Sequence, residues 1–236
     1  MSVEAIRAVL FDSGDTLLAP AGGAWWPRPA LRDLLNQLAS AVEPDRLTAA
    51  LDRGMEFLDT HHQVATEDDE VAQFREYYAI VLRELDLDAN SETIEKLARV
   101  QIEQELFPDV RDTLEELRRA GLKLGIVSNA WPSLERTYRS LGLRDFFDAF
   151  VISSQLGCLK PDPRIYRVAI EQISVEPESI LFVDDDPEYV HAAESLGMRG
   201  VVMCRYEIHD RSAGTITNLA ELRSIVSPND LGSPKK

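Results

Sequence analysis

Polar side chains follow short apolar runs at several separate places along this sequence. Asp12 comes directly after the apolar run 8–11, and the pair Asp184-Asp185 comes after the run 180–183. A hydroxyl, an amide and a lysine stand in comparable places, and the whole set is Asp12, Ser128, Asn129, Lys160, Asp184 and Asp185. A carboxylate nucleophile, a hydroxyl, a lysine and an acidic pair are the groups that metal-assisted phosphoryl transfer requires. Alone, each also has a structural explanation: a helix cap for the serine, a surface position for the lysine and a turn for the aspartates.

The apolar runs predict the strands that position these residues. Ala8–Phe11 is continuously apolar, which is typical of a strand buried on both faces. Further strands are predicted at 122–127, 149–153, 180–183 and 199–203, alternating with helices at 110–120, 132–141, 163–173, 187–196 and 218–225. Such alternation requires right-handed crossovers and a parallel sheet. Because parallel strands end along one edge, we expect the polar residues to meet there. The fold class is α/β, with a Rossmann-like parallel sheet core and helices on both faces.

Residues 29–105 have a helical pattern without a strand signal. Leu31, Leu34, Leu35 and Leu38 lie on one face of a helix, and three later stretches repeat this spacing. We therefore expect an insert of about four helices after the first strand. The predicted organisation is a Rossmann-like core at 1–18 and 106–226, an α-helical unit at 19–105 and a disordered tail at 227–236.

The composition narrows the class of protein. The chain has 236 residues and a formal net charge of −16, which argues against nucleic acid or an anionic membrane as a partner, because both attract basic patches. The first apolar run is too short to span a bilayer, so a cytoplasmic location is expected. Cys158 and Cys204 form no disulfide framework, and we expect both to stay reduced.

Several conspicuous residues in and near the insert have two interpretations. Trp25 and Trp26 lie in a loop rich in Gly and Pro, where they line a pocket or, as we favour, pin the loop to the protein. His61 and His62 are adjacent on a helix and do not share a face, which favours an exposed pair over a metal site. The acidic run 67–70 fits the first turn of a helix, where it complements the helix dipole, better than a metal site.

Taken together and in this order, the motifs resemble those of the haloacid dehalogenase-like (HAD) hydrolase superfamily. The resemblance covers about residues 5–20 and 106–205, and the helical insert is similar to the family's small α-helical cap domain. It implies a sheet whose first strand is central and a cap that closes over the strand ends.

The resemblance also implies roles for individual residues. Asp12 would be the covalent nucleophile, giving an aspartyl-phosphate in the family's phosphatases. Ser128 would bind the phosphoryl group, and Lys160, in a Lys-Pro-Asp-Pro-x-Ile-Tyr run, would stabilise the nucleophile and the transferring group. The implied cofactor is Mg²⁺, held by Asp12, the backbone carbonyl of Gly14, Asp185 and the adjacent Asp184.

The implied substrate is a small phosphorylated metabolite. Its specificity would reside in the insert, the loop at 18–28 and the strand ends. The candidate substrate-binding residues are Asn129, Thr16, Trp25, Trp26 and Arg28.

One position departs from the family pattern. The family's phosphatases carry a second aspartate two residues after the nucleophile, which protonates the leaving group and then activates water. Here Gly14 takes that position, and Asp15 follows where the family has glycine. Asp15 is a candidate substitute, although a shift of one residue usually turns a side chain to another side of the backbone. Without a substitute we expect a slow phosphatase biased towards good leaving groups, because acid–base assistance is worth about 10²–10⁴-fold.

Three alternatives remain open from the sequence. Phosphonoacetaldehyde hydrolases use a cap lysine as a Schiff base, and Lys96 is the one lysine between residues 18 and 105. The 2-haloacid dehalogenases need no magnesium, and Arg28 or Arg32 would serve as their carboxylate clamp, but the retained acidic pair resembles a metal site. With its acid lost, the fold could also act as a binding or scaffold protein, which has no need of the retained nucleophile, serine, lysine and acidic pair.

Overall fold

A parallel sheet forms the centre of the protein. The computed structural model describes residues 4–37, 42–206 and 214–226, so the tail predicted at 227–236 lies outside the described residues. The six strands lie in the order β5-β4-β1-β6-β7-β8 and all pair in parallel, which confirms the predicted fold class and the central first strand. Their bounds are Ala8–Phe11 (β1), Lys123–Ser128 (β4), Ala149–Ile152 (β5), Ile180–Asp184 (β6), Arg199–Met203 (β7) and Thr215–Ile216 (β8).

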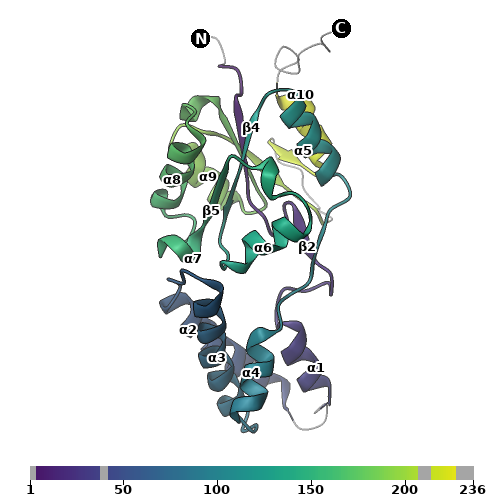
Figure 1. Ribbon diagram of the computed structural model, residues 1–236, viewed down its shortest axis with the longest axis vertical. Helices are drawn as coiled ribbons and strands as arrows, with labels where there is room; N and C mark the ends of the chain where they lie inside the picture. Colours follow the sequence, from purple (N-terminus) through teal and green to yellow (C-terminus); the bar gives the residue numbers. More distant parts are fainter. Residues whose placement is uncertain (1–3, 38–41, 207–213, 227–236) are drawn as a thin grey trace.

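Helices cover both faces of this sheet (Figure 1). They are α5 (Val110–Arg119), α6 (Ser133–Ser140), α7 (Ser153–Leu156), α8 (Pro163–Ile173), α9 (Pro187–Glu194) and α10 (Leu222–Ile225), with short 3₁₀ turns at Arg144–Phe146, Pro177–Ser179 and Leu219–Glu221. Pro163 and Pro187 begin α8 and α9, where a missing N–H costs nothing, and the side chains of Asp162 and Asp186 cap these two helices.

Successive residues of β1 point to opposite faces of the sheet. Ala8 and Leu10 pack into a core with α8 and α9, whereas Val9 and Phe11 pack into a second core with α5, α6 and α10. All four side chains are fully buried, as their continuous apolar run predicted. The central strand is therefore rigidly placed, and so is the residue that follows it.

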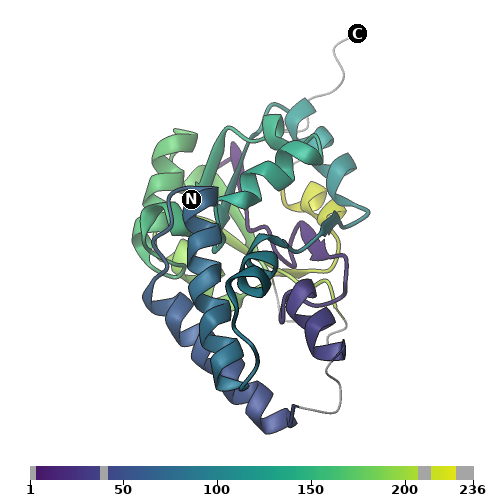
Figure 2. The ribbon, with the colours of Figure 1, turned by 60° about the horizontal axis from the view of Figure 1, so that its bottom comes forward.

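A separate bundle, which we call the helical unit, lies below the carboxyl ends of the strands (Figures 1 and 2). It consists of α1 (Pro29–Gln37), α2 (Pro44–Thr60), α3 (Glu67–Glu84) and α4 (Ser91–Arg99), which together bury a core of their own. The acidic run 67–70 forms the first turn of α3, as predicted, behind a capping box made by Thr66 and Asp69. The N-cap of α4 is Asn90, whose side chain accepts the N–H of Thr93.

The two chain segments that join the helical unit to the sheet pair with each other. β2 (Leu18–Pro20) and β3 (Gln104–Leu106) form an antiparallel ribbon in which Leu18 lies opposite Leu106. These strands fall at the two ends of the predicted helical segment and were not expected from the sequence. Each of the two strands has three residues, which are too few to show an alternating pattern, and β2 contains a proline.

Glu70 fastens the helical unit to the sheet domain, and we call it the latch residue. Its side chain is 1% exposed and accepts hydrogen bonds from the backbone N–H and the hydroxyl of Ser133, at 3.0 and 2.9 Å. Beside it, the Trp131 indole donates to Gln73 at 2.6 Å. Ser133 and Trp131 belong to the loop and helix that follow β4, so α3 is held directly against the strand ends.

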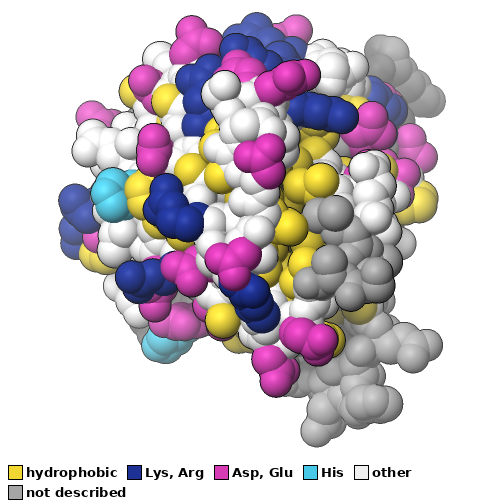
Figure 3. Space-filling view, turned by 90° about the horizontal axis from the view of Figure 1, so that it is seen from below, with side chains coloured by type: hydrophobic (Ala, Val, Ile, Leu, Met, Phe, Trp, Pro, Cys, Tyr) yellow, Lys and Arg dark blue, Asp and Glu magenta, His cyan; other side chains and the backbone are white. Residues whose placement is uncertain are grey.

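The outer surface of the helical end has mixed charge. Seen from below, acidic and basic side chains are interspersed around a band of hydrophobic side chains (Figure 3). No helix among the described residues is long and apolar enough to cross a membrane.

Candidate active site

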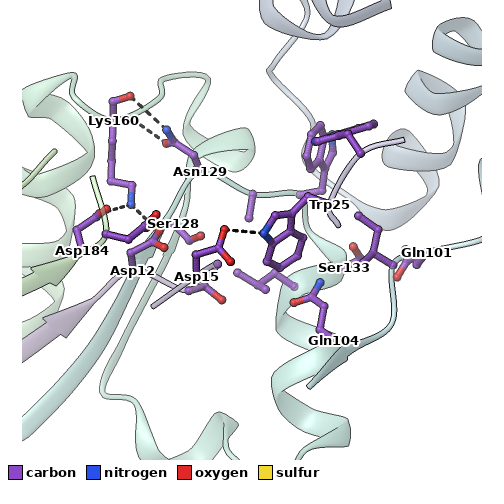
Figure 4. A pocket seen from close by; sticks show the side chains of 18 of the residues that line it. Asp12, Asp15, Trp25, Gln101, Gln104, Ser128, Asn129, Ser133, Lys160 and Asp184 are labelled. Carbon is purple, nitrogen blue, oxygen red and sulfur yellow. Dashed lines mark hydrogen bonds and ion pairs between the residues drawn. The ribbon is translucent and has the colours of Figure 1, made fainter. Parts of the chain in front are cut away.

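A cavity of about 280 Å³ lies between the carboxyl ends of the strands and the helical unit. It brings together nearly all of the residues that the sequence indicated, from both parts of the protein (Figure 4). They are Asp12, Gly14, Asp15, Trp25, Trp26, Arg28, Ser128, Asn129, Lys160, Asp184 and Asp185.

Three neighbouring strands place the polar groups at one edge. β1 pairs with β4 on one side and β6 on the other, in a register that sets Phe11 beside Ile126 and Val183. Asp12, one residue beyond Phe11, therefore lies next to the ends of both neighbours. A lysine from the segment before α8 completes the group.

Lys160 bridges two carboxylates in the floor of the cavity. Its Nζ lies 2.5 Å from Asp12 Oδ1 and 2.6 Å from Asp184 Oδ2, and all three side chains are nearly or fully buried (Figure 4). Burial alone would lower the pKa of Lys160, but attraction to Asp12 and Asp184 raises it above its usual value. The ammonium group therefore stays charged and holds Asp12 in a fixed orientation.

The acidic groups outnumber the lysine that neutralises them. Carboxylate oxygens of Asp12, Asp184 and Asp185 lie within 4.8 Å of one another. Burial, followed by repulsion from Asp12, raises the pKa of Asp184 and brings that of Asp185 to about 6. Hard carboxylate oxygens in excess of nearby positive charge fit a divalent cation such as Mg²⁺, which would relieve this repulsion.

Asn129 fixes the backbone of Lys160. Its Oδ1 accepts the Lys160 N–H at 2.7 Å, and its Nδ2 donates to the Lys160 carbonyl at 3.2 Å. Asn129 also lines the cavity, and its expected contact with substrate stays a prediction. Ser128, at the end of β4, is buried and lines the cavity.

The backbone of the Gly14-Asp15 pair explains part of the exchange seen in the sequence. Asp15 has a φ of 54°, in the left-handed region that favours glycine, whereas Gly14 is not among the residues with positive φ. The left-handed conformation therefore lies at residue 15, although the glycine of this pair is residue 14. Aspartate tolerates this conformation better than most residues.

The Asp15 carboxylate is held by two donors. The Trp25 indole N–H donates to Oδ2 at 2.7 Å (Figure 4), and the Tyr206 hydroxyl donates to Oδ1 at 2.8 Å. Asp15 thus lines the cavity with both oxygens occupied.

Aromatic rings surround a buried guanidinium on the other side of the cavity. The Arg28 Cζ lies 3.4 Å from the ring centroid of Phe74. It lies 5.8 Å from the ring centroid of Trp26 and 5.6 Å from that of Trp131. Its Nη2 is 3.6 Å from Glu70, and its buried Nε has no hydrogen-bond partner among the described residues. Burial lowers the pKa of Arg28 despite these partners.

Comparison with known proteins gives a consistent result. A family model described as haloacid dehalogenase-like hydrolase matches residues 6–197. The chain belongs to the haloacid dehalogenase-like hydrolase family. It is 34% identical over 167 residues to Phosphatase MT3486 of Mycobacterium tuberculosis, covering 66% of this chain and 72% of that protein. It is 36% identical over 105 residues to an (S)-2-haloacid dehalogenase of a Pseudomonas species, covering 44% of this chain and 45% of that protein.

Solved structures of the family share the fold. A HAD phosphatase from Thermococcus onnurineus superposes with a TM-score of 0.58 at 27% identity, covering 93% of this chain and 97% of that one. Family membership and the phosphatases among the relatives make this protein a phosphatase-like HAD hydrolase.

Some residues indicated by the sequence lie outside the cavity of this HAD hydrolase. Thr16 is fully buried, its Oγ1 has no partner among the described residues, and it is absent from the cavity lining. Lys96 is exposed on α4, and Arg32 donates to the carbonyl of Gly22. His61 is exposed, as expected. His62 is half-buried, and its Nε2 lies 3.0 Å from the Gly157 carbonyl oxygen.

Other cavity residues were missed. Trp131 and Ser133 follow the same strand as Ser128, so the rule that found the serine could have found them. Gln101 and Gln104 lie on the segment that returns from α4, which has no sequence signal of function. Tyr206, which follows β7 and is not part of the cavity lining, donates to Asp15 from 191 positions away in the sequence.

Proposed function

We propose that this HAD hydrolase is a magnesium-dependent phosphatase that cleaves a small phosphorylated metabolite through an aspartyl-phosphate on Asp12. The observation that supports it best is the contact of Lys160 with Asp12 and Asp184 beneath a cavity at the strand ends. A buried carboxylate oriented by an ammonium group is suited to attack an electrophile that carries negative charge.

The proposed reaction has two displacements at phosphorus. An oxygen of Asp12 bonds to phosphorus while the bond to the leaving oxygen breaks, and that oxygen departs with the bonding electrons as an anion that takes a proton from water. Water then attacks phosphorus, the bond to the Asp12 oxygen breaks, and inorganic phosphate is released. Ser128 and Lys160 donate hydrogen bonds to the phosphoryl oxygens, where charge is greatest in both transition states.

Magnesium would be held by Asp12, Asp184 and Asp185, with the backbone carbonyl of Gly14 as a further ligand, and would neutralise charge on the phosphoryl oxygens. The absence of a carboxylate at residue 14 makes us expect slow turnover. Each oxygen of Asp15 accepts a hydrogen bond, from Trp25 or from Tyr206, and we assign Asp15 no proton transfer in this reaction.

The alternatives are less well supported. A Schiff base on Lys96 is not favoured because that lysine is exposed and away from the cavity. A dehalogenase needs no cation, whereas the cluster of Asp12, Asp184 and Asp185 carries more negative charge than Lys160 balances. Arg28 does line the cavity and remains a candidate for binding an acidic group of the substrate.

The test is hydrolysis of a panel of phosphate monoesters with and without Mg²⁺. We expect turnover that EDTA abolishes and that Asp12→Asn reduces by at least about 10³-fold, because the nucleophile is lost. Asp45→Asn, an exposed position on α2, is the matched control and should keep full activity. Equal turnover by Asp12→Asn and wild type would refute the proposal.

A further inference from the structure

Trp25 lies against the backbone of residue 14. A Cβ atom placed on Gly14 would be 3.2 Å from Cζ2 of Trp25 and 3.7 Å from Cε2. The indole N–H is bonded to Asp15, which fixes the orientation of the ring (Figure 4). The ring therefore fills the space into which a side chain on residue 14 would extend.

Asp15 is the one carboxylate on this side of the cavity among the described residues, and it is bonded to Trp25 and Tyr206. Gly14 has no side chain, the Trp25 N–H is bonded, and both Asp15 oxygens accept hydrogen bonds. Gln101, Gln104 and Arg28 also line this side, but amides and a guanidinium donate hydrogen bonds without releasing a proton near neutral pH. The acidic cluster and Lys160 occupy the opposite, sheet side (Figure 4).

Aromatic rings form much of the same wall. All three tryptophans of the chain line the cavity. Trp26 and Trp131 are 6.1 Å apart between ring centroids, and Trp131 is anchored through its N–H to Gln73. Because Asp12 attacks from the sheet side, the leaving group has to depart towards these rings.

We propose that Trp25 selects the leaving group, and that this group is a planar ring joined to phosphorus through an acidic oxygen, as in a phenol or an enol. This inference rests on the phosphatase function proposed above. A phenolic oxygen has a pKa of about 10, against about 16 for water, so it departs as an anion without a proton donor. The planar ring packs on the indole, which gives the substrate its binding energy.

Three substrates separate the two halves of the proposal. Phenyl phosphate has a planar ring and an acidic leaving oxygen, benzyl phosphate has the ring without the acidic oxygen, and cyclohexyl phosphate has neither. We expect kcat/KM for phenyl phosphate to exceed that for benzyl phosphate by at least about 100-fold, the usual value of a missing acid, because kcat/KM reports the first displacement and not the hydrolysis of the shared aspartyl-phosphate. We expect KM for cyclohexyl phosphate to exceed that for benzyl phosphate about five- to tenfold. Equal kcat/KM for the phenyl and benzyl esters would overturn the proposal.

Variants at residues 25 and 14 test the role of the indole. Trp25→Ala should abolish the KM difference between benzyl and cyclohexyl phosphate, while Trp25→Phe should keep it. Gly14→Asp should raise kcat for benzyl phosphate little by itself, but at least about tenfold when combined with Trp25→Ala, which makes room for the new carboxylate. An equal gain in Gly14→Asp alone would show that the indole does not occupy the position.

Binding separates this inference from the proposed function. Phenylphosphonate and methylphosphonate are not hydrolysed, and their affinities can be measured by calorimetry with Mg²⁺ present. Tighter binding of phenylphosphonate, lost in Trp25→Ala, supports the selection of a planar group even if no ester is hydrolysed. Equal affinities overturn the selection by Trp25 but leave the phosphatase function intact.

Discussion

Among single residues, Lys160 has the largest expected effect on stability. In Lys160→Met, Asp12 and Asp184 stay buried without their cation, and breaking such a buried pair costs about 3–5 kcal/mol at neutral pH. The loss should shrink as the pH falls towards 5, because Asp184, whose pKa is raised, then takes up a proton that the unfolded chain binds less tightly. The free energy of unfolding of both proteins, measured with denaturant at several pH values without Mg²⁺, tests this prediction.

Lys123→Met is the control for that measurement. The Nζ of Lys123 donates to the Ile173 carbonyl from an exposed side chain, so its removal should cost under about 1.5 kcal/mol. A similar loss in both variants would mean that the charges at the cavity floor are not coupled to folding.

The proposed magnesium site should depend on pH through Asp185. Because its pKa is raised to about 6, a proton competes with the cation below that pH. We expect the Mg²⁺ affinity, measured by calorimetry, to fall as the pH is lowered from 8 through about 6. Asp185→Asn should bind Mg²⁺ at least about tenfold more weakly at pH 8 and show a weaker pH dependence, which would then come from Asp184, whose pKa is also raised. A pH-independent affinity in wild type would argue against Asp185 as a ligand.

At the scale of elements, Glu70 on α3 joins the helical unit to α6. In Glu70→Ala, the N–H and hydroxyl of Ser133 lose their acceptors, and Arg28 stays buried without its partner. We therefore expect the free energy of unfolding to fall by about 3–5 kcal/mol. Glu67→Ala, one turn earlier, breaks an exposed ion pair with Arg136 and should cost under about 1 kcal/mol. Thermal or denaturant unfolding compares the two, and equal losses would contradict the role of the latch residue.

The elements also show what a sequence can predict. The helix at 163–173 is found at the expected bounds because Pro163 starts it and its apolar spacing is regular. The convergence of Asp12, Ser128 and Asp184 follows from strand ends in a parallel sheet, which is a property of topology.

What could not be predicted depends on loop geometry and on contacts between distant segments. The ribbon of β2 and β3 rests on pairing across the whole helical insert, with no local pattern. The packing of Trp25 on Gly14 and the bond from Tyr206 to Asp15 are set by side chains from separate loops. Charge and hydrophobicity patterns do not encode such contacts.

At the scale of the whole molecule, the net charge of −16 acts on both ligands of the proposed reaction. It attracts Mg²⁺ and repels a phosphate dianion, and both effects are screened as salt is added. Raising KCl from about 20 to about 300 mM should therefore weaken Mg²⁺ binding, while kcat/KM at saturating Mg²⁺ should rise. A fall in kcat/KM with salt would indicate a locally positive approach to the cavity instead.

The antiparallel ribbon of β2 and β3 has a consequence for engineering. Because Leu18 and Leu106 face each other, the helical unit leaves the sheet domain and returns to it at one point. From the viewpoint of the core, the unit is a single long loop with adjacent ends, and adjacent ends are what tolerated insertions require. Exchange of the segment between these two leucines for the corresponding segment of another family member is thus a graft whose two chain junctions lie side by side, which keeps the core and replaces the helical side of the cavity.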